Sequence, residues 1–326
     1  MERELALEVV RVTELAALAS APWVGRGSKN QADLSATEAM RRMFGSVPVR
    51  GTVVIGEGEM DEAPMLYIGE SVGRGSGPEV DVAVDPLEGT ELAARGLNGA
   101  LSVLAMAPRG SLLHAPDMYM EKLAVGPALS GKLSLLDPLS VTMRKAAREL
   151  GKPLTELTVA ILDRERHEAA ISELRKLGVR IRMLPGGDVA GAMATCYPES
   201  GVDIYAGSGG APEGVLAAAA LRCLGGELQG RLLPEDEEQA GRCAAMGIAD
   251  ASRVLGMDDM VGTGDVIFAA TGITQGDFLD GVRYLPDGTV WTHSVVMRAE
   301  TRTLRHIQTR HDLSLKVVDG GREAAV

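Results

Sequence analysis

The spacing of apolar positions predicts two helices at the start of the chain. Apolar residues recur at helical intervals over residues 4–20, at Leu5, Val9, Val12 and Ala16. Ser35 and Glu38 have the spacing of a capping box, so a second helix is expected from about residue 35 to residue 44. The polar stretch 25–33 contains two glycines and is expected to form a turn between them.

Strand patterns follow, and from residue 157 they alternate with helical patterns. Strands are expected at 52–55, 80–84, 100–107, 157–162, 179–184 and 202–206. Helices are expected at 140–150, 167–177, 188–196 and 212–224. The alternation indicates βαβ units with parallel strands.

The C-terminal part returns to strand patterns. Strands are expected at 266–270, 278–285, 289–297 and 303–309, with Asp287-Gly288 as a hairpin turn. We expect a domain boundary near residue 150, which gives an α+β half over residues 1–150 and an α/β half over residues 151–326. The last strands are free to pair back onto either half.

Composition and charge narrow the class of protein. Hydrophobic residues make up 45% of the 326 positions, which excludes general disorder. The net charge of −12 argues against binding to nucleic acid. An acidic protein still binds a phosphorylated substrate where metal ions reverse the local charge.

Cysteines and apolar runs indicate the compartment. The three cysteines include no CxxC pair, so neither a disulfide framework nor a zinc ribbon is expected. The N-terminus lacks the pattern of a signal peptide, and the longest apolar runs, such as 215–221, are too short to cross a membrane. We therefore expect a cytoplasmic protein that does not associate with membranes.

The strongest candidate for chemistry is the stretch Asp85-Pro86-Leu87-Glu88-Gly89-Thr90, which follows an expected strand. Two carboxylates, a hydroxyl and the backbone amides of an expected helix start suit a hard cation bridged to a phosphate. Taken alone, the same pattern more often marks a helix cap with an exposed glutamate.

A second acidic stretch, residues 56–62, also follows an expected strand. Gly56 and Gly58 flank Glu57 and would let its side chain approach a ligand. Asp61 lies close enough along the chain to orient water or a ligand. By itself this stretch is more typical of an acidic surface loop than of a ligand site.

Together these motifs resemble the lithium-sensitive, magnesium-dependent sugar phosphatases, and within them the class II fructose-1,6-bisphosphatases of bacteria. The resemblance runs from about residue 3 to residue 315. It is carried by Lys29-Asn30-Gln31-Ala32-Asp33, Val54-Ile55-Gly56-Glu57-Gly58-Glu59, Asp85-Pro86-Leu87-Glu88-Gly89-Thr90, Tyr119-Met120-Glu121-Lys122 and Gly207-Ser208-Gly209-Gly210-Ala211-Pro212-Glu213-Gly214. It implies the layered α/β fold of sugar phosphatases, α-β-α-β-α with mixed sheets.

The resemblance also implies two or more Mn²⁺ or Mg²⁺ ions per site. The positions that match metal ligands are Asp33, Glu57, Asp85, Glu88 and Glu213. Oxygen ligands of this kind favour these hard ions over zinc. From the residues alone, a helix-capping role is favoured for both Asp33 and Glu213. The resemblance favours ligation, and places the metals in the N-terminal half.

Substrate contacts are implied mainly in the C-terminal half. The matching positions are Glu88, Gly89, Thr90, Tyr119, Arg164, Glu165, Arg166, Gly186, Gly187, Asp188 and Gly210. Arg164 and Arg166 match positions that hold the phosphate that is not cleaved, and a guanidinium fits phosphate geometry well. Lys29, Asp61 and Thr90 are the candidate catalytic residues.

The implied enzyme is a phosphoric monoester hydrolase that releases the C1 phosphate of fructose 1,6-bisphosphate. A dual enzyme that also cleaves sedoheptulose 1,7-bisphosphate is the main alternative. An inositol-phosphatase-like enzyme and a non-catalytic sugar-phosphate sensor are weaker ones. The resemblance implies a homodimer or homotetramer, and neither nucleic acid nor a membrane is expected as a partner.

Overall fold

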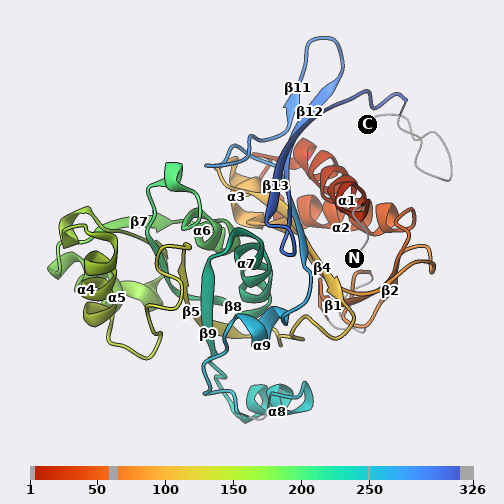
Figure 1. Cartoon of the computed structure of the whole chain (residues 1–326). Helices are drawn as coiled ribbons and strands as arrows, with labels where there is room; N and C mark the ends of the chain where they lie inside the picture. Colours follow the sequence, from red (N-terminus) through yellow and green to blue (C-terminus); the bar gives the residue numbers. More distant parts are fainter. Residues whose placement is uncertain (1–3, 59–64, 249, 316–326) are drawn as a thin grey trace. The chain divides into compact units, whose positions relative to one another are not determined.

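The computed structural model describes residues 4–58, 65–248 and 250–315. The chain forms two compact units (Figure 1). Unit 1 comprises residues 1–109, 267–298 and 303–326, and unit 2 comprises residues 110–266 and 299–302.

These divisions differ from the boundary expected near residue 150. β10 (Ile267–Gly272) pairs antiparallel with β4 (Leu101–Pro108), from Ile267 opposite Met106 to Gly272 opposite Leu101. The last strands therefore pair back onto the N-terminal half, one of the two possibilities that the sequence leaves open. Figure 1 shows these blue strands in the same unit as the red and orange N-terminal elements.

Unit 1 is built on an eight-stranded mixed sheet in the order β11-β12-β10-β4-β3-β1-β2, with β13 paired to β12. Its other strands are β1 (Arg50–Ile55), β2 (Ser71–Val72), β3 (Glu79–Glu88), β11 (Arg283–Tyr284), β12 (Val290–Arg298) and β13 (Thr303–His311). Its helices are α1 (Leu5–Ser20), α2 (Lys29–Phe44) and α3 (Thr90–Arg95).

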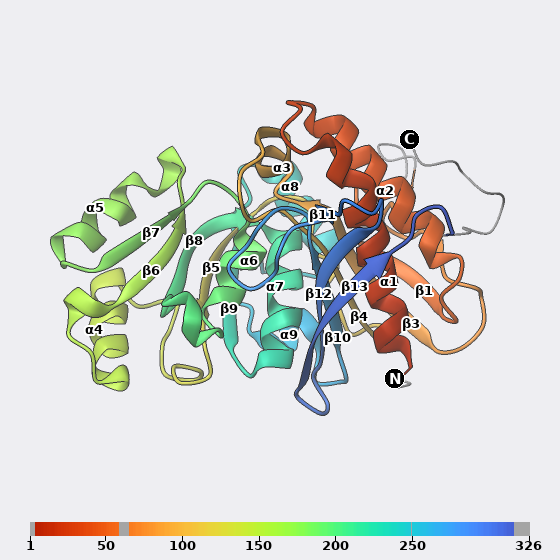
Figure 2. The ribbon, with the colours of Figure 1, turned by 90° about the horizontal axis from the view of Figure 1, so that it is seen from above.

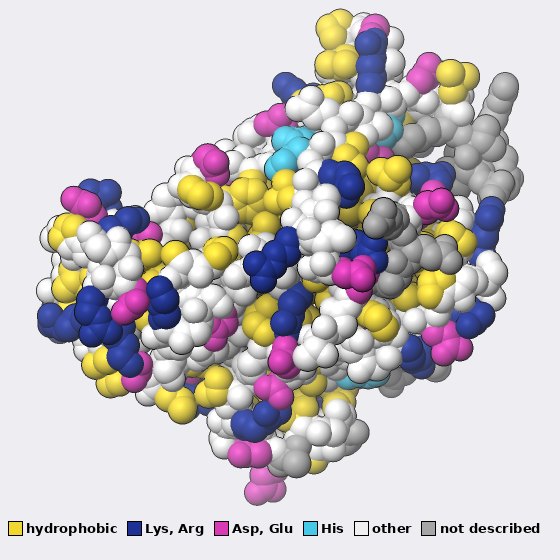
Figure 3. Space-filling view, in the orientation of Figure 1, with side chains coloured by type: hydrophobic (Ala, Val, Ile, Leu, Met, Phe, Trp, Pro, Cys, Tyr) yellow, Lys and Arg dark blue, Asp and Glu magenta, His cyan; other side chains and the backbone are white. Residues whose placement is uncertain are grey.

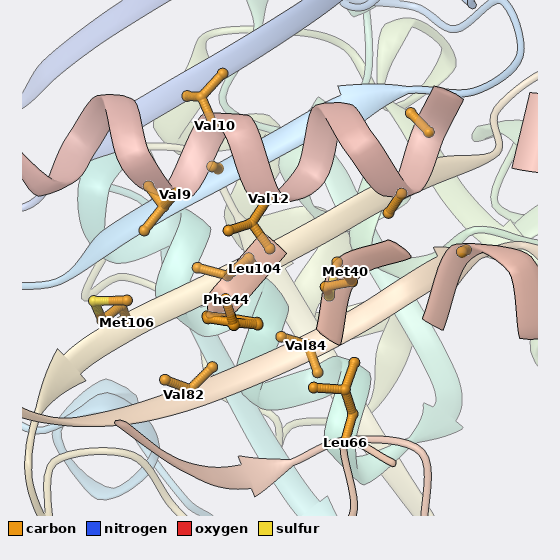
Figure 4. Packing of buried hydrophobic residues seen from close by; sticks show 14 of the residues in the cluster. Val9, Val10, Val12, Met40, Phe44, Leu66, Val82, Val84, Leu104 and Met106 are labelled. Atoms are coloured by element: carbon orange, nitrogen blue, oxygen red, sulfur yellow. The ribbon is translucent and has the colours of Figure 1, made fainter. Parts of the chain in front are cut away.

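The two long helices of unit 1 pack on its sheet and build its core. α1 contacts β4, β10 and β12, and α2 contacts α1 and β3. Val9 and Val12 of α1, together with Met40 and Phe44 of α2, are completely buried against the strands (Figure 4). The predicted spacing of apolar residues in the first helix is confirmed by this packing.

Unit 2 is built on a five-stranded mixed sheet in the order β7-β6-β8-β5-β9. Its strands are β5 (Tyr119–Val125), β6 (Thr158–Leu162), β7 (Arg180–Leu184), β8 (Ile204–Gly210) and β9 (Glu227–Leu232). Its helices are α4 (Leu139–Leu150), α5 (Glu168–Lys176), α6 (Asp188–Ala194), α7 (Ala211–Leu224), α8 (Glu237–Ala245) and α9 (Met257–Val261).

Helices cover both faces of the unit 2 sheet (Figure 2). Leu123 and Val125 of β5 pack with Met143 of α4 and Leu174 of α5 in one apolar cluster. α6 and α7 contact each other and the sheet. β6 is parallel to both β7 and β8, so the predicted βαβ arrangement is confirmed. The predicted α/β class with mixed sheets is also confirmed.

The helix expected to begin near residue 35 begins at Lys29 instead. The glycines before it end the preceding segment, since Gly25 and Gly27 adopt φ of 74° and donate backbone hydrogen bonds to α3. Ala32 and Ala36 are buried, so the apolar stripe extends one turn further back than the capping-box pattern indicated. Residues 29–33 are therefore helical rather than a turn.

Other boundaries were also wrong. The strand expected at 80–84 continues as β3 to Glu88, where a bulge against β4 lies between Asp85 and Glu88. Only Arg283–Tyr284 of the strand expected at 278–285 forms. β5 and β9 were not predicted, because each mixes charged and apolar residues without a long β-branched run. The Asp287-Gly288 hairpin turn is confirmed by the pairing of β11 with β12.

The surface carries both signs of charge. On the face shown in Figure 3, Lys and Arg side chains are mixed with Asp and Glu side chains. Among the described residues, no helix is long and apolar enough to cross a membrane.

Candidate active site

Strand pairing in unit 1 brings two candidate carboxylates to the same edge of the sheet. β1 and β3 are parallel neighbours, with Ile55 opposite Ala83. Glu57 and Asp85 each lie two residues beyond these paired positions. Because carboxyl ends of parallel strands meet at one edge, this edge is where ligands of α/β sheets usually bind.

Asp33 reaches the Glu57 side chain from helix α2, and the two half-buried carboxyl groups share a hydrogen bond. Burial raises the pKa of Glu57 to about 8, and the neighbouring Asp33 charge acts in the same direction. Burial also raises the pKa of Asp33. Two acids held together in this way are poised to accept a cation, which would stabilise both as carboxylates.

A glycine forms the turn from β3 into α3. Glu88 is 3% exposed, and Gly89 adopts φ 85° immediately before Thr90, the first residue of α3. A side chain at position 89 would be strained in that conformation. Asp85 Oδ1 accepts a 3.1 Å hydrogen bond from the Leu87 backbone nitrogen. The predicted helix start at Thr90 is confirmed.

Two further candidates in the sequence of unit 1 are Lys29 and Asp61. Lys29 is exposed and lies one helical turn before Asp33, on the same face of α2. Asp61 lies outside the described residues. The structure therefore brings Asp33 and Glu57 into contact and places Asp85, Glu88 and Thr90 at the end of the strand next to β1.

In unit 2 a buried lysine lies among the candidate acids. Lys122 Nζ lies 2.5 Å from Asp188 Oδ2, and both side chains are more than 90% buried. Burial and the charge of Asp188 raise the pKa of Glu213, whereas the Lys122 ammonium lowers it. The positive charge of Lys122 thus partly offsets the negative charge of Asp188 and Glu213, two residues that were predicted from the sequence to bind ligands.

Glycines let these carboxylates approach the backbone. A Cβ at position 210 would collide with the carboxylate of Glu213, and a Cβ at position 209 would collide with that of Asp188. Asp188 is the first residue of α6, directly after Gly186 and Gly187. The structure therefore places Gly210, Asp188 and Glu213 together.

Two exposed arginines, Arg164 and Arg166, follow β6. The Arg166 guanidinium lies over the Tyr119 ring, 4.5 Å from its centroid. Arg164 is exposed and donates hydrogen bonds to the backbone oxygens of Asp163 (2.8 Å) and Pro185 (3.0 Å). Glu165 is exposed between them. Both guanidiniums are accessible to an anion.

The model of the family described as bacterial fructose-1,6-bisphosphatase, glpX-encoded, matches residues 3–311. The chain belongs to this family. It is 51% identical to fructose-1,6-bisphosphatase 1 class 2 of Escherichia coli (strain K12), with 97% of each chain covered. It is 46% identical to the class 2 enzyme of Haemophilus influenzae, with 96% of this chain and 97% of that one covered. The predicted family resemblance is confirmed.

A solved structure of inositol monophosphatase from Anabaena (Nostoc) sp. PCC 7120 is similar at 16% identity and a TM-score of 0.30. The similarity covers 59% of this chain and 70% of that one. Values this low do not bear on the fold of this fructose-1,6-bisphosphatase family member.

The candidate carboxylates of this fructose-1,6-bisphosphatase family member are chemically suitable ligands for a divalent cation. All are hard oxygen donors, and Asp33 and Glu57 form a hydrogen-bonded pair of acids. Within residues 4–58, 65–248 and 250–315, no three His, Cys, Asp or Glu side chains form a ready metal-binding group. Glu213 belongs to unit 2, and the other four proposed ligands belong to unit 1.

Sequence reasoning missed three residues of this fructose-1,6-bisphosphatase family member that touch the candidates. Lys122 contacts Asp188, Ser208 binds Arg166, and His167 binds Ser208. Lys122 and Ser208 were part of the motifs that carry the resemblance. His167 has no metal-binding spacing and was assigned no role.

The Asp33–Glu57 pair predicts an unusual dependence of stability on pH. The pKa of Glu57 is about 8 in the folded protein and about 4.5 in the unfolded chain. The contribution of this carboxyl group to the free energy of unfolding is therefore fully present below pH 4.5 and is lost as the pH rises through 8. In excess EDTA at pH 8.5, we expect Glu57→Gln to stabilise the chain by about 1–2 kcal/mol, roughly 2–8 °C in Tm.

The control for this prediction is the same measurement at pH 4.5, where the gain should vanish because Glu57 is then largely protonated. Differential scanning calorimetry of both proteins at the two pH values provides the comparison. A Glu57→Gln variant that melts below the parent protein at pH 8.5 would contradict the proposed repulsion.

Proposed function

We propose that this protein hydrolyses the C1 phosphate of fructose 1,6-bisphosphate, giving fructose 6-phosphate and phosphate. The observation that carries the proposal is family membership over residues 3–311. The relatives named above as fructose-1,6-bisphosphatases cover 97% of their own length in the match. The carboxylates of both units and the two arginines of unit 2 are consistent with this activity.

In the proposed site Asp33, Glu57, Asp85, Glu88 and Glu213 hold divalent cations, Mn²⁺ or Mg²⁺, with two or more per site. Such a cation offsets phosphoryl charge and lowers the pKa of bound water. Glu57 and Asp33 contribute most when both are ionised, because their mutual repulsion in the unloaded protein favours cation binding. Lys122 keeps Asp188 oriented beside Glu213.

Thr90 is proposed to orient the attacking water through its hydroxyl. The turn at Gly89 positions the backbone of Thr90 at the start of α3. The preceding Glu88 is buried at the end of β3. Asp85 or Glu57 accepts the proton that the water loses. General base catalysis of this kind typically contributes about 10²–10⁴-fold to the rate. Lys29 and Asp61 are proposed to assist by offsetting charge and orienting water.

Arg164 and Arg166 are proposed to hold the phosphate that is not cleaved. Tyr119 supports the Arg166 guanidinium from one face, Ser208 binds its Nε and Nη2, and we propose that Nη1 faces the anion. Glu165, Gly186, Gly187 and Gly210 complete the proposed substrate contacts. Fixing the far end of the substrate converts binding energy into orientation at the reacting phosphate.

A substrate comparison tests the proposal. With Mn²⁺ present, phosphate release is measured from fructose 1,6-bisphosphate, sedoheptulose 1,7-bisphosphate and inositol 1-phosphate. We expect kcat/KM for fructose 1,6-bisphosphate to exceed that for inositol 1-phosphate at least about 100-fold, because only the bisphosphate engages the arginines. Faster hydrolysis of inositol phosphate would contradict the proposal. We further propose that the enzyme acts in the cytoplasm as a homo-oligomer.

A further inference from the structure

His167 is a buried histidine with a defined arrangement of hydrogen bonds. Its side chain is 4% exposed. Nδ1 lies 2.8 Å from the backbone oxygen of Leu162, which only accepts hydrogen bonds, so Nδ1 carries the proton. Nε2 accepts a 2.8 Å hydrogen bond from the Ser208 backbone nitrogen. The ring is therefore the neutral tautomer with Nε2 as acceptor, and burial lowers its pKa, which maintains this state near pH 7.

Ser208 connects this histidine to Arg166. Its Oγ lies 3.1 Å from His167 Nε2 and donates to it, because Nε2 is an acceptor. The same Oγ accepts a 3.0 Å hydrogen bond from Arg166 Nε, and the Ser208 backbone oxygen accepts a 2.8 Å bond from Arg166 Nη2. The guanidinium is thus held along one edge by Ser208 and on one face by Tyr119.

This chain of hydrogen bonds runs from the buried His167 through Ser208 to the exposed Arg166. Leu162 lies at the end of β6, His167 precedes α5, and Ser208 lies in β8. All three side chains or backbone groups belong to unit 2. A cavity of about 490 Å³ has Arg166, His167 and Ser208 among its lining residues, so side-chain packing does not fill all the space around this network.

We propose that His167 and Ser208 are positioning residues that hold the Arg166 guanidinium in the orientation that receives the uncleaved phosphate. The proposal rests on the proposed function, because it assumes that Arg166 binds this phosphate. Without the two hydrogen bonds to Ser208, the long arginine side chain samples several rotamers, and ordering it opposes binding. Hydrogen bonds in a linked network also reinforce one another.

The test measures binding of fructose 6-phosphate, which carries only the uncleaved phosphate, by calorimetry in the presence of Mg²⁺. We expect Ser208→Ala and His167→Asn each to raise the Kd about 3–10-fold. Asparagine retains a donor near the Nδ1 position and loses the Nε2 acceptor. In an Arg166→Ala background both substitutions should have no further effect, since their shared target is gone. His114→Asn, at an exposed histidine of the same unit, is the matched control and should leave the Kd unchanged.

Turnover separates positioning from general damage. With fructose 1,6-bisphosphate the variants should raise KM with little change in kcat, whereas hydrolysis of fructose 1-phosphate, which lacks the distal phosphate, should be unaffected. Equal losses on both substrates, or additive effects with Arg166→Ala, would overturn the proposal. If His167→Asn does not fold, Ser208→Ala decides the question alone.

The outcomes also separate this inference from the proposed function. If the parent protein binds fructose 6-phosphate but releases no phosphate from the bisphosphate, the proposed function fails and the binding series still tests the positioning role. If the parent protein does not bind fructose 6-phosphate, the assignment of Arg166 and the positioning role both fail.

Discussion

Thr90→Ala is expected to reduce kcat for fructose 1,6-bisphosphate by about 10²–10³-fold, because it removes the hydroxyl that orients the attacking water. Thr90 is half-buried at the first position of α3, so the substitution leaves the Gly89 turn and the β3 carboxylates in place. Steady-state phosphate release measures kcat, and calorimetric titration with Mn²⁺ measures the metal affinity, which should change little.

Thr90→Ser is the matched control for this experiment. Serine keeps the hydroxyl and should retain activity within about tenfold of the parent protein. A Thr90→Ala variant with near-normal kcat would contradict the role of the hydroxyl. An inactive Thr90→Ser variant would show that the methyl group, and therefore packing, matters more than the hydroxyl.

Arg166→Ala is expected to raise KM for fructose 1,6-bisphosphate about 10–100-fold. The reason is the loss of charge-assisted hydrogen bonds to phosphate, each contributing about 1.5–3 kcal/mol. Because Arg166 is exposed and contacts Ser208 and the Tyr119 ring, the fold should tolerate the change. Initial rates over a range of substrate concentrations separate KM from kcat.

Arg164→Ala is the companion variant, because Arg164 is also exposed but bonds to backbone oxygens of Asp163 and Pro185. It should raise KM as well, and Arg166→Lys should recover only part of the loss, since lysine lacks the planar fork. An unchanged KM in both alanine variants would exclude the proposed binding of the uncleaved phosphate by Arg164 and Arg166.

The sequence predicted those elements whose pattern is long and regular. α1, α4 and the βαβ succession over β6, α5 and β7 formed close to their predicted bounds. The first turn of α2 was missed because its start depends on contacts of the Gly25 and Gly27 amides with α3, which lie far along the chain. β5 was missed because Glu121 and Lys122 interrupt its apolar pattern.

Some features of the candidate site could be predicted from the local sequence, and others could not. The position of Thr90 at a helix start follows from the local sequence, and the pairing of Ile55 with Ala83 explains why Glu57 and Asp85 lie at one edge. Asp33 was ambiguous because a helix cap and a metal ligand use the same residue type. The roles of Lys122, His167 and Ser208 depend on hydrogen bonds between distant segments, which no local pattern encodes.

The most direct test of the account is the identity of the product formed by the purified protein from fructose 1,6-bisphosphate, with Mn²⁺ and in excess EDTA. The account predicts release of one phosphate per sugar, with fructose 6-phosphate as the other product, and loss of this release in EDTA. Formation of fructose 1-phosphate, equal release in EDTA, or no release with Mn²⁺ or Mg²⁺ would contradict it.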